Sequence, residues 1–168
     1  GLDTGPILLQ KEVDIDPDDT LGSIYFDSLF PMGVDAMLEA IDLVRGGNAP
    51  REVQDPNDGS YEGWCRKEDV EIDWSKPSDE IYNLIRGANP QPGAWTTFNG
   101  SEVKIFDSRK ADGNGEPGSV VSIDDSGLVV STADGAIRIM KVRADAGKMT
   151  AIEYASEAGL AVGTRLGS

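Results

Sequence analysis

Between Ala94 and Val142, apolar and polar residues alternate in five short runs, and this pattern constrains the fold more than any other feature. Asn99-Gly100 joins the first two runs and is a strong hairpin signal, because both residues tolerate a positive φ. Asp125-Ser126-Gly127 and Asp134-Gly135 separate the later runs. The runs are AWTTF, SEVKIF, SVVSI, LVVSTA and AIRIMKV. Five short strands with tight turns predict a small OB-like β-barrel.

Helical signals lie on both sides of these strands. Thr150-Ala151-Ile152-Glu153 forms a capping box, which predicts a C-terminal helix. A second helix is expected to begin at Ser75 and to end near Gly87, with Pro77 in its first turn, where a missing amide costs little. The apolar residues of this second helix that we expect to be buried are Ile81, Leu84 and Ile85.

The first third of the chain has the pattern of an α/β unit. Residues 7–13 predict a strand after a Gly-Pro turn. A long helix follows, capped at its start by Asp19 or Thr20, kinked or briefly broken at Pro31 and Gly33, and ended by Gly46-Gly47. Such a unit needs further strands to cover its apolar face. We therefore expect three regions: residues 1–47, a linker over 48–76 rich in Pro, Asp, Asn and Gly, and residues 77–168.

Composition limits the classes of function. The 168 residues are 39% apolar and 27% charged, which indicates a soluble globular protein, and no apolar run is long enough to span a membrane. We expect a cytoplasmic protein, because no signal peptide is evident and the single cysteine, Cys65, cannot form an internal disulfide. The net charge of −15 disfavours a general nucleic-acid binder, although eight of the fifteen basic residues lie within 101–168.

The chain contains no histidine, the side chain most often used for acid–base chemistry near neutral pH. Cys65 as a nucleophile would therefore lack the usual activating base. The sequence indicates either a protein that is not an enzyme or one part of an enzyme.

Asp3, in the string Leu2-Asp3-Thr4-Gly5, is the first candidate for a catalytic carboxylate. The same letters occur in aspartic proteases, but that chemistry needs two facing loops and only one such string is present. Later aspartates at 14, 16 and 18 have EF-hand spacing, yet Asp19 stands where glycine is needed and Tyr25 where a bidentate glutamate is needed. That stretch is best interpreted as a solvated acidic turn. For Asp3, a catalytic role and a simple turn role both remain open.

Several stretches together resemble the folate-dependent formyltransferase family. They are GLDTGPILLQKEVDIDPDDT, YEG, IDWSKPSDEIYNLIRGANPQPGAW, PGSVV and VGTRLG, in the family's order along essentially the whole chain. The family includes methionyl-tRNA formyltransferases, sugar-nucleotide amine formyltransferases and the hydrolase domain of formyltetrahydrofolate dehydrogenase. The stretches LLQKE, LFPMG and IRGANPQPGAW look closest to that hydrolase domain.

The resemblance implies an α+β organisation: the end of a Rossmann-like formyltransferase domain (strand plus long helix), a linker, and an OB-like β-barrel with a C-terminal helix. It maps the family's catalytic aspartate to Asp3 and places Gly1, Leu2 and Thr4 beside the folate pocket. The family's catalytic Asn and His come from an upstream half that has no counterpart here. We therefore expect this polypeptide alone not to catalyse formyl transfer.

The function implied for the complete protein is use of formyltetrahydrofolate as formyl donor, without a metal, with a small amine or water as acceptor. A tRNA acceptor is disfavoured by the net charge, although basic residues of the last region would be the ones to contact it: Lys104, Arg109, Lys110, Lys141 and Arg143. The alternative is a separately made OB-like domain that binds a partner and has no catalytic role. The sequence leaves the oligomeric state open.

Overall fold

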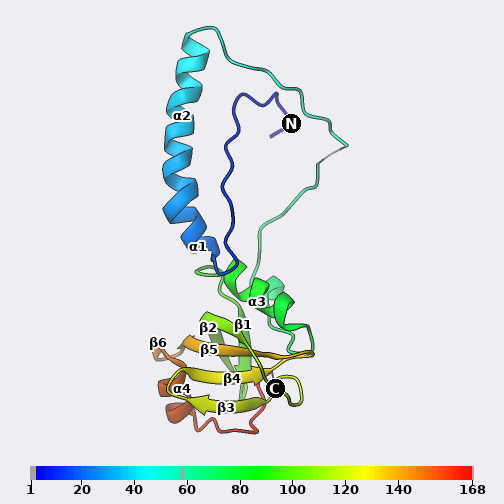
Figure 1. Ribbon diagram of the computed structural model, residues 1–168, viewed down its shortest axis with the longest axis vertical. Coiled ribbons are helices and arrows are strands. Elements are labelled where there is room, and N and C mark those ends of the chain that lie inside the picture. The colour runs from blue at the N-terminus through cyan, green and yellow to red at the C-terminus, as the bar shows by residue number, and fades with distance from the viewer. Residues whose placement is uncertain (1–2, 58, 168) are drawn as a thin grey trace. The chain divides into compact units, whose positions relative to one another are not determined.

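The computed structural model describes residues 3–57 and 59–167, which divide into two compact units, Gly1–Trp64 and Cys65–Ser168 (Figure 1). None of the helices in the described residues is long and apolar enough to cross a membrane. Each unit is described by itself below.

The first unit is built around one continuous helical stretch. It consists of α1 (Leu21–Ser23), a π-helical turn η1 (Ile24–Leu29) and α2 (Phe30–Arg45). Thr20 caps it as expected: the Thr20 hydroxyl accepts from the Ser23 amide, and the Ser23 hydroxyl accepts from the Thr20 amide. The expected break at Pro31 takes the form of the π-helical turn just before it, in which the Phe30 amide bonds to the Tyr25 carbonyl. The prolyl nitrogen cannot donate, and a wider turn next to it accommodates the lost bond.

The predicted strand over residues 7–13 is wrong. Ile7 alone forms an antiparallel bridge, to Glu52, with amide-to-carbonyl distances of 2.8 and 3.0 Å in the two directions. Residues 8–13 are described without any ladder partner. A strand is defined by its neighbours, and apolar residues in sequence do not supply them.

The second unit is a mixed helix and antiparallel-sheet structure. Its strands are β1 (Trp95–Phe98), β2 (Ser101–Ala111), β3 (Val120–Asp124), β4 (Gly127–Ser131), β5 (Ala136–Ala144) and β6 (Gly147–Thr150). The order is β1-β2-β5-β4-β3, and β6 pairs with the free part of β5. No ladder among the described residues joins β1 to β3, so the sheet does not close into the expected barrel.

The turn and cap signals in this unit are confirmed. Asn99 and Gly100 have φ angles of 49° and 75° and connect Phe98 to its partner Ser101, as the hairpin prediction required. The C-terminal helix α4 (Ala151–Ala158) begins at the Thr150 capping box, with the Glu153 amide donating to the Thr150 hydroxyl at 3.2 Å. Strand β6 was not expected, because its four residues, Gly-Lys-Met-Thr, are too short a run to establish an alternating pattern.

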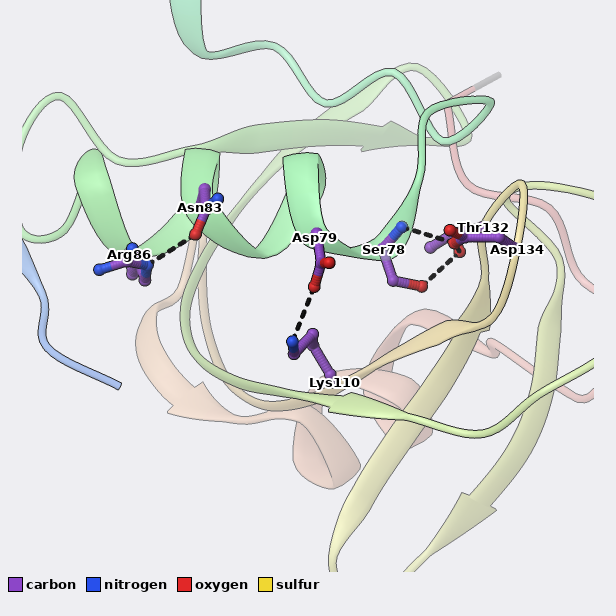
Figure 2. Close-up of polar contacts among 7 residues, drawn as sticks. All are labelled: Ser78, Asp79, Asn83, Arg86, Lys110, Thr132 and Asp134. Atoms are coloured by element: carbon purple, nitrogen blue, oxygen red, sulfur yellow. Dashed lines mark hydrogen bonds and ion pairs between the residues drawn. The ribbon is translucent and has the colours of Figure 1, made fainter. Parts of the chain in front are cut away.

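Helix α3 (Ser78–Gly87) begins three residues later than expected and has Pro77 as its N-cap. Ile81 and Ile85 are buried as expected, and Leu84 is half-buried against the same core. Polar bonds hold the start of α3 to the β4–β5 turn: the Ser78 amide donates to Asp134 Oδ1 at 2.8 Å, and the Ser78 and Thr132 hydroxyls lie 2.7 Å apart (Figure 2). The bond from the Ser78 amide lowers the pKa of Asp134.

The end of the predicted linker is part of the folded core. A short 3-10 turn, η2 (Glu68–Val70), leads into alternating buried residues at Val70, Ile72 and Trp74. The Ile72 amide donates to the Trp95 carbonyl at 2.8 Å, which fastens this segment alongside β1. The second unit therefore includes residues 65–76, which the sequence alone assigned to the linker.

Candidate functional site

Asp3 lies in an exposed turn with left-handed backbone, φ 56°. A non-glycine residue in this region costs free energy and persists when its surroundings hold it, which is common at functional positions. The restraint comes from Gln54, whose side-chain amide donates to the Asp3 carbonyl at 3.0 Å and to the Gly5 carbonyl at 2.7 Å. The Asp3 carboxylate thus belongs to a turn whose backbone is fixed from a segment 51 residues away.

Gln54 was missed in the sequence analysis. It lies within the expected linker, and no local pattern distinguishes it from neighbouring polar residues. The antiparallel Ile7–Glu52 bridge brings Gln54 to the turn. Gln54, two positions after Glu52, lies level with Gly5, two positions before Ile7. Only this long-range pairing reveals its position.

The other predicted site residues carry less structural information. Thr4 is exposed and follows Asp3 in the same turn. Gly1 and Leu2 lie outside the described residues. The roles of all four residues in catalysis or folate binding remain predictions. Among residues 3–57 and 59–167, no group of three Asp, Glu or Cys side chains is placed to hold a metal ion.

The helical stretch of the first unit presents large apolar side chains to solvent. Phe26, Phe30, Met37 and Leu38 are each 58–66% exposed, and Val44 is 59% exposed. Soluble proteins rarely leave such a continuous apolar face uncovered. This face has the spacing and composition of one that normally packs against a sheet.

In the second unit, the basic residues expected to face an acceptor differ in their partners. Lys110 pairs with Asp79 at 2.7 Å (Figure 2), and Arg109 lies 3.6 Å from Asp107. The Lys104 ammonium donates to the Pro92 carbonyl at 2.9 Å. Two of the five expected cations are therefore compensated by nearby carboxylates.

A hollow of about 310 Å³ opens between the β1–β2 hairpin, the β5–β6 turn and α4. Tyr154 is buried in its wall, and burial, together with the charge of Asp145, raises the pKa of its phenol. The other ionisable residues that line it, Glu102, Asp145 and Glu157, are all acidic. An anionic ligand such as a folate carboxylate or a phosphate would be repelled from this hollow.

The three tryptophans lie in three different environments. Trp74 is in the core and donates to the Thr96 hydroxyl at 3.0 Å. The Trp95 indole donates to the Lys67 carbonyl at 2.8 Å, with the Lys67 ammonium 5.0 Å from the ring centre. Trp64 is 92% exposed. Trp74 and Trp95 thus attach the 65–76 segment to the sheet.

Comparison with known families identifies the second unit. The family described as "Formyl transferase, C-terminal domain" matches residues 65–158, which is more than half of the chain and begins where the second unit begins. The chain belongs to the formyltransferase family.

Relatives extend this similarity beyond the C-terminal domain. The chain is 39% identical over 159 residues to the human mitochondrial 10-formyltetrahydrofolate dehydrogenase, covering 89% of this chain and 17% of that protein. It is 38% identical over 168 residues to the methionyl-tRNA formyltransferase of Geotalea daltonii, covering 99% of this chain and 54% of that protein. The chain spans about half or less of the length of these relatives.

Solved structures confirm the fold. A variant of HypX from Aquifex aeolicus matches with a TM-score of 0.72 and 21% identity over 92% of this chain and 29% of that one. WlaRD, a sugar 3N-formyl transferase crystallised with dTDP and 5-N-formyl-THF, matches with a TM-score of 0.59 and 28% identity over 83% of this chain and 50% of that one. The expected resemblance to formyltransferases is confirmed.

Proposed function

We propose that this chain is the C-terminal part of an enzyme that uses formyltetrahydrofolate and passes its formyl group to a small amine or to water. The observation that carries the proposal is the match of residues 65–158 to the formyltransferase C-terminal domain, in a chain whose sequence also contains the string Leu-Asp-Thr-Gly upstream. In this proposal residues 1–47 end the catalytic domain, 48–76 link it onward, and the sheet of the second unit is a relative of the OB-like barrel.

The proposed reaction needs a proton carrier. An amine nitrogen attacks the formyl carbon, the bond from that carbon to the folate nitrogen breaks, and one amine proton is transferred to the folate nitrogen. In the hydrolytic version water attacks and formate leaves. A carboxylate near the attacking atom can accept and return a proton, which typically contributes a factor of about 10²–10⁴ in rate.

Asp3 is our candidate for that carboxylate. Its backbone is held by the Gln54 amide, so the side chain starts from a fixed position, while its exposure leaves it accessible to a ligand. Fixed catalytic groups lower the entropy cost of reaching the reactive geometry. We propose that Gly1, Leu2 and Thr4 flank the bound folate, and that the Asn and His implied by the resemblance lie in upstream sequence of the complete protein.

We propose that the formyl acceptor is a small molecule and not tRNA. Among the five basic residues expected to contact tRNA, Arg109 and Lys110 are bound to acidic neighbours, which lowers the positive potential of that surface. The chain as a whole carries −15, so phosphate contacts would have to overcome its repulsion. Saturable tRNA binding by the complete protein at physiological salt would contradict this part of the proposal.

The first experiment is to measure the intact mass of the polypeptide as its source produces it. A mass near twice the 17.9 kDa of this chain would place Asp3 mid-chain, as the enzyme proposal requires. A mass of 17.9 kDa would favour the alternative of a separately made binding domain, and co-purification with a second polypeptide would then identify its partner.

The second experiment assays the complete protein with formyltetrahydrofolate, with and without a panel of small amines. We expect Asp3→Asn to lower kcat by about 10²-fold or more while leaving the melting temperature unchanged. Asp14→Asn is the matched control, because Asp14 is an exposed aspartate of the same unit. Equal activity of the two variants would contradict the role of Asp3 and leave it a turn residue.

A further inference from the structure

Three neighbouring strands of the second unit carry a row of cations on one face. Lys104 of β2 lies opposite Arg143 of β5, and Arg143 lies opposite Lys148 of β6. Like charges directly opposite one another across strands destabilise a sheet. Ile105 and Val142, the residues next to Lys104 and Arg143, are buried, so the cations alternate to the outer face.

An aromatic side chain lies within this row. Phe106 falls at an irregularity in the β2–β5 register, where Ile105 and Asp107 pair with successive residues of β5 and Phe106 has no partner. The Arg143 guanidinium lies 5.6 Å from the centre of the Phe106 ring, and the Lys148 ammonium 5.0 Å from it. Bulges of this kind often re-aim a side chain beside a functional site.

What distinguishes these cations from other described basic residues without an ion pair, such as Arg51 and Lys76, is that they lie together on adjacent strands. Elsewhere in the described residues, ion pairs join basic to acidic side chains, for example Lys110 to Asp79 and Arg138 to Asp124. Within the described part of the chain, Lys141, Arg143 and Lys148 make no ion pair. In a protein of net charge −15, three neighbouring cations that make no ion pair leave a local positive potential that favours an external anion.

A concave surface accompanies the cations. An open pocket of about 350 Å³ is lined by Phe106, Lys141, Lys148, Val142 and Met149, together with Thr150 and Glu153 at the start of α4. The lining thus combines apolar side chains with two cations, which is the usual composition of a small-molecule site with a few orienting charges.

We propose that this surface, which we call the Phe106 patch (Lys104, Phe106, Lys141, Arg143 and Lys148), binds a compact small molecule carrying several closely spaced anionic groups. Acidic side chains surround the patch and limit the size of the anion. Asp107 lies opposite Lys141, Asp145 follows Arg143 by two residues, and Glu153 lines the pocket. A long polyanion such as RNA would meet these carboxylates, whereas a compact di- or trivalent anion fits between them. The proposal goes beyond formyl transfer and does not depend on it.

The test is titration calorimetry of the 168-residue chain with two probes, tripolyphosphate and citrate. We expect saturable binding with one site per chain, weakened at least tenfold when salt is raised from about 20 to about 200 mM. Stronger binding of tripolyphosphate would identify phosphates as the anionic groups, and stronger binding of citrate would identify carboxylates. Absence of saturable binding by either probe would overturn the proposal.

Two triple variants decide whether the patch is responsible. Lys141→Gln, Arg143→Gln and Lys148→Gln together should weaken binding at least tenfold without lowering the melting temperature. Removing the mutual repulsion of these cations should even raise it. The matched control replaces three exposed cations elsewhere, Arg51, Arg66 and Lys76, by Gln, and so changes the net charge equally. Equal weakening by both variants, or tighter binding of a single-stranded RNA than of tripolyphosphate, would overturn the proposal.

Discussion

The hydrogen bond between Trp74 and Thr96 holds the 65–76 segment to strand β1, and its free energy can be measured. Trp74 Nε1 donates to Thr96 Oγ1 at 3.0 Å, and the two residues are 5% and 2% exposed. Trp74→Phe leaves the Thr96 hydroxyl buried without its donor. Thr96→Val leaves the indole N–H buried without its acceptor. The double variant replaces both polar groups by apolar ones.

The expected energies follow from the cost of a buried polar group without a partner, about 1–3 kcal/mol. Thr96→Val should cost that amount, because valine has nearly the same shape as threonine. Trp74→Phe should cost roughly 2–4 kcal/mol, since a smaller ring also leaves a cavity. In the Trp74→Phe background, Thr96→Val should cost almost nothing. The coupling energy between the two positions is then about 1–3 kcal/mol.

The assay is urea unfolding of the 168-residue chain, followed by circular dichroism because one variant removes a fluorescent residue. Thr97→Val is the matched control, since Thr97 is the next strand residue and is only half-buried; it should change the free energy of unfolding by less than about 0.5 kcal/mol. Additive effects of Trp74→Phe and Thr96→Val would refute the reasoning, because the bond would then contribute nothing specific.

Four further predictions concern local features of the two units. Gly127→Ala should destabilise the second unit by about 3 kcal/mol or more in thermal unfolding, because a Cβ there would lie 2.1 Å from the Ile139 carbonyl oxygen at a φ of 131°. A loss of less than about 1 kcal/mol in the free energy of unfolding would contradict this prediction. Ser131→Ala should be neutral or stabilising by about 1 kcal/mol, since that hydroxyl is fully buried without a partner in the described chain, and clear destabilisation would show a hidden bond. Asp134→Asn should lower the melting temperature at pH 7, and the difference between variant and parent should vanish in acid. Because the pKa of Asp134 is lowered in the folded protein, its carboxylate stabilises the fold above the ordinary carboxyl pKa, and this stabilisation is lost as the pH falls through the pKa of the folded state. Limited proteolysis should cut the exposed apolar helix of the first unit before the second unit, read out by fragment masses, and the reverse order would contradict the exposure of Phe26 and its neighbours.

Features that depend on a few consecutive residues could be predicted from the sequence. Asn99-Gly100 makes its hairpin because both residues accept a positive φ, and Thr150 caps α4 through a bond to an amide three residues away. Thr20 caps the long helix by the same mechanism. In each case the partners are so close along the chain that neighbouring residue types determine the geometry.

Features that depend on distant partners could not. The apolar residues over 8–13 form no strand, since a strand needs a ladder and only Ile7 finds a partner. Strand β6 was missed for the opposite reason: its four residues are too few to indicate a strand, and it exists because β5 extends far enough to pair with it. The position of Gln54 at the Asp3 turn likewise rests on a contact across 51 residues.

By itself the sequence determined the turns, the helix caps, the buried stripe of α3 and the family to which the chain belongs. Only the tertiary structure decided the strand order β1-β2-β5-β4-β3, the inclusion of residues 65–76 in the core, and the alignment of Lys104, Arg143 and Lys148 in one row. The physical reason is the range of the interactions. Caps and tight turns are made by bonds between near neighbours, whereas strand order and surface charge patterns arise when the whole core finds its lowest free energy.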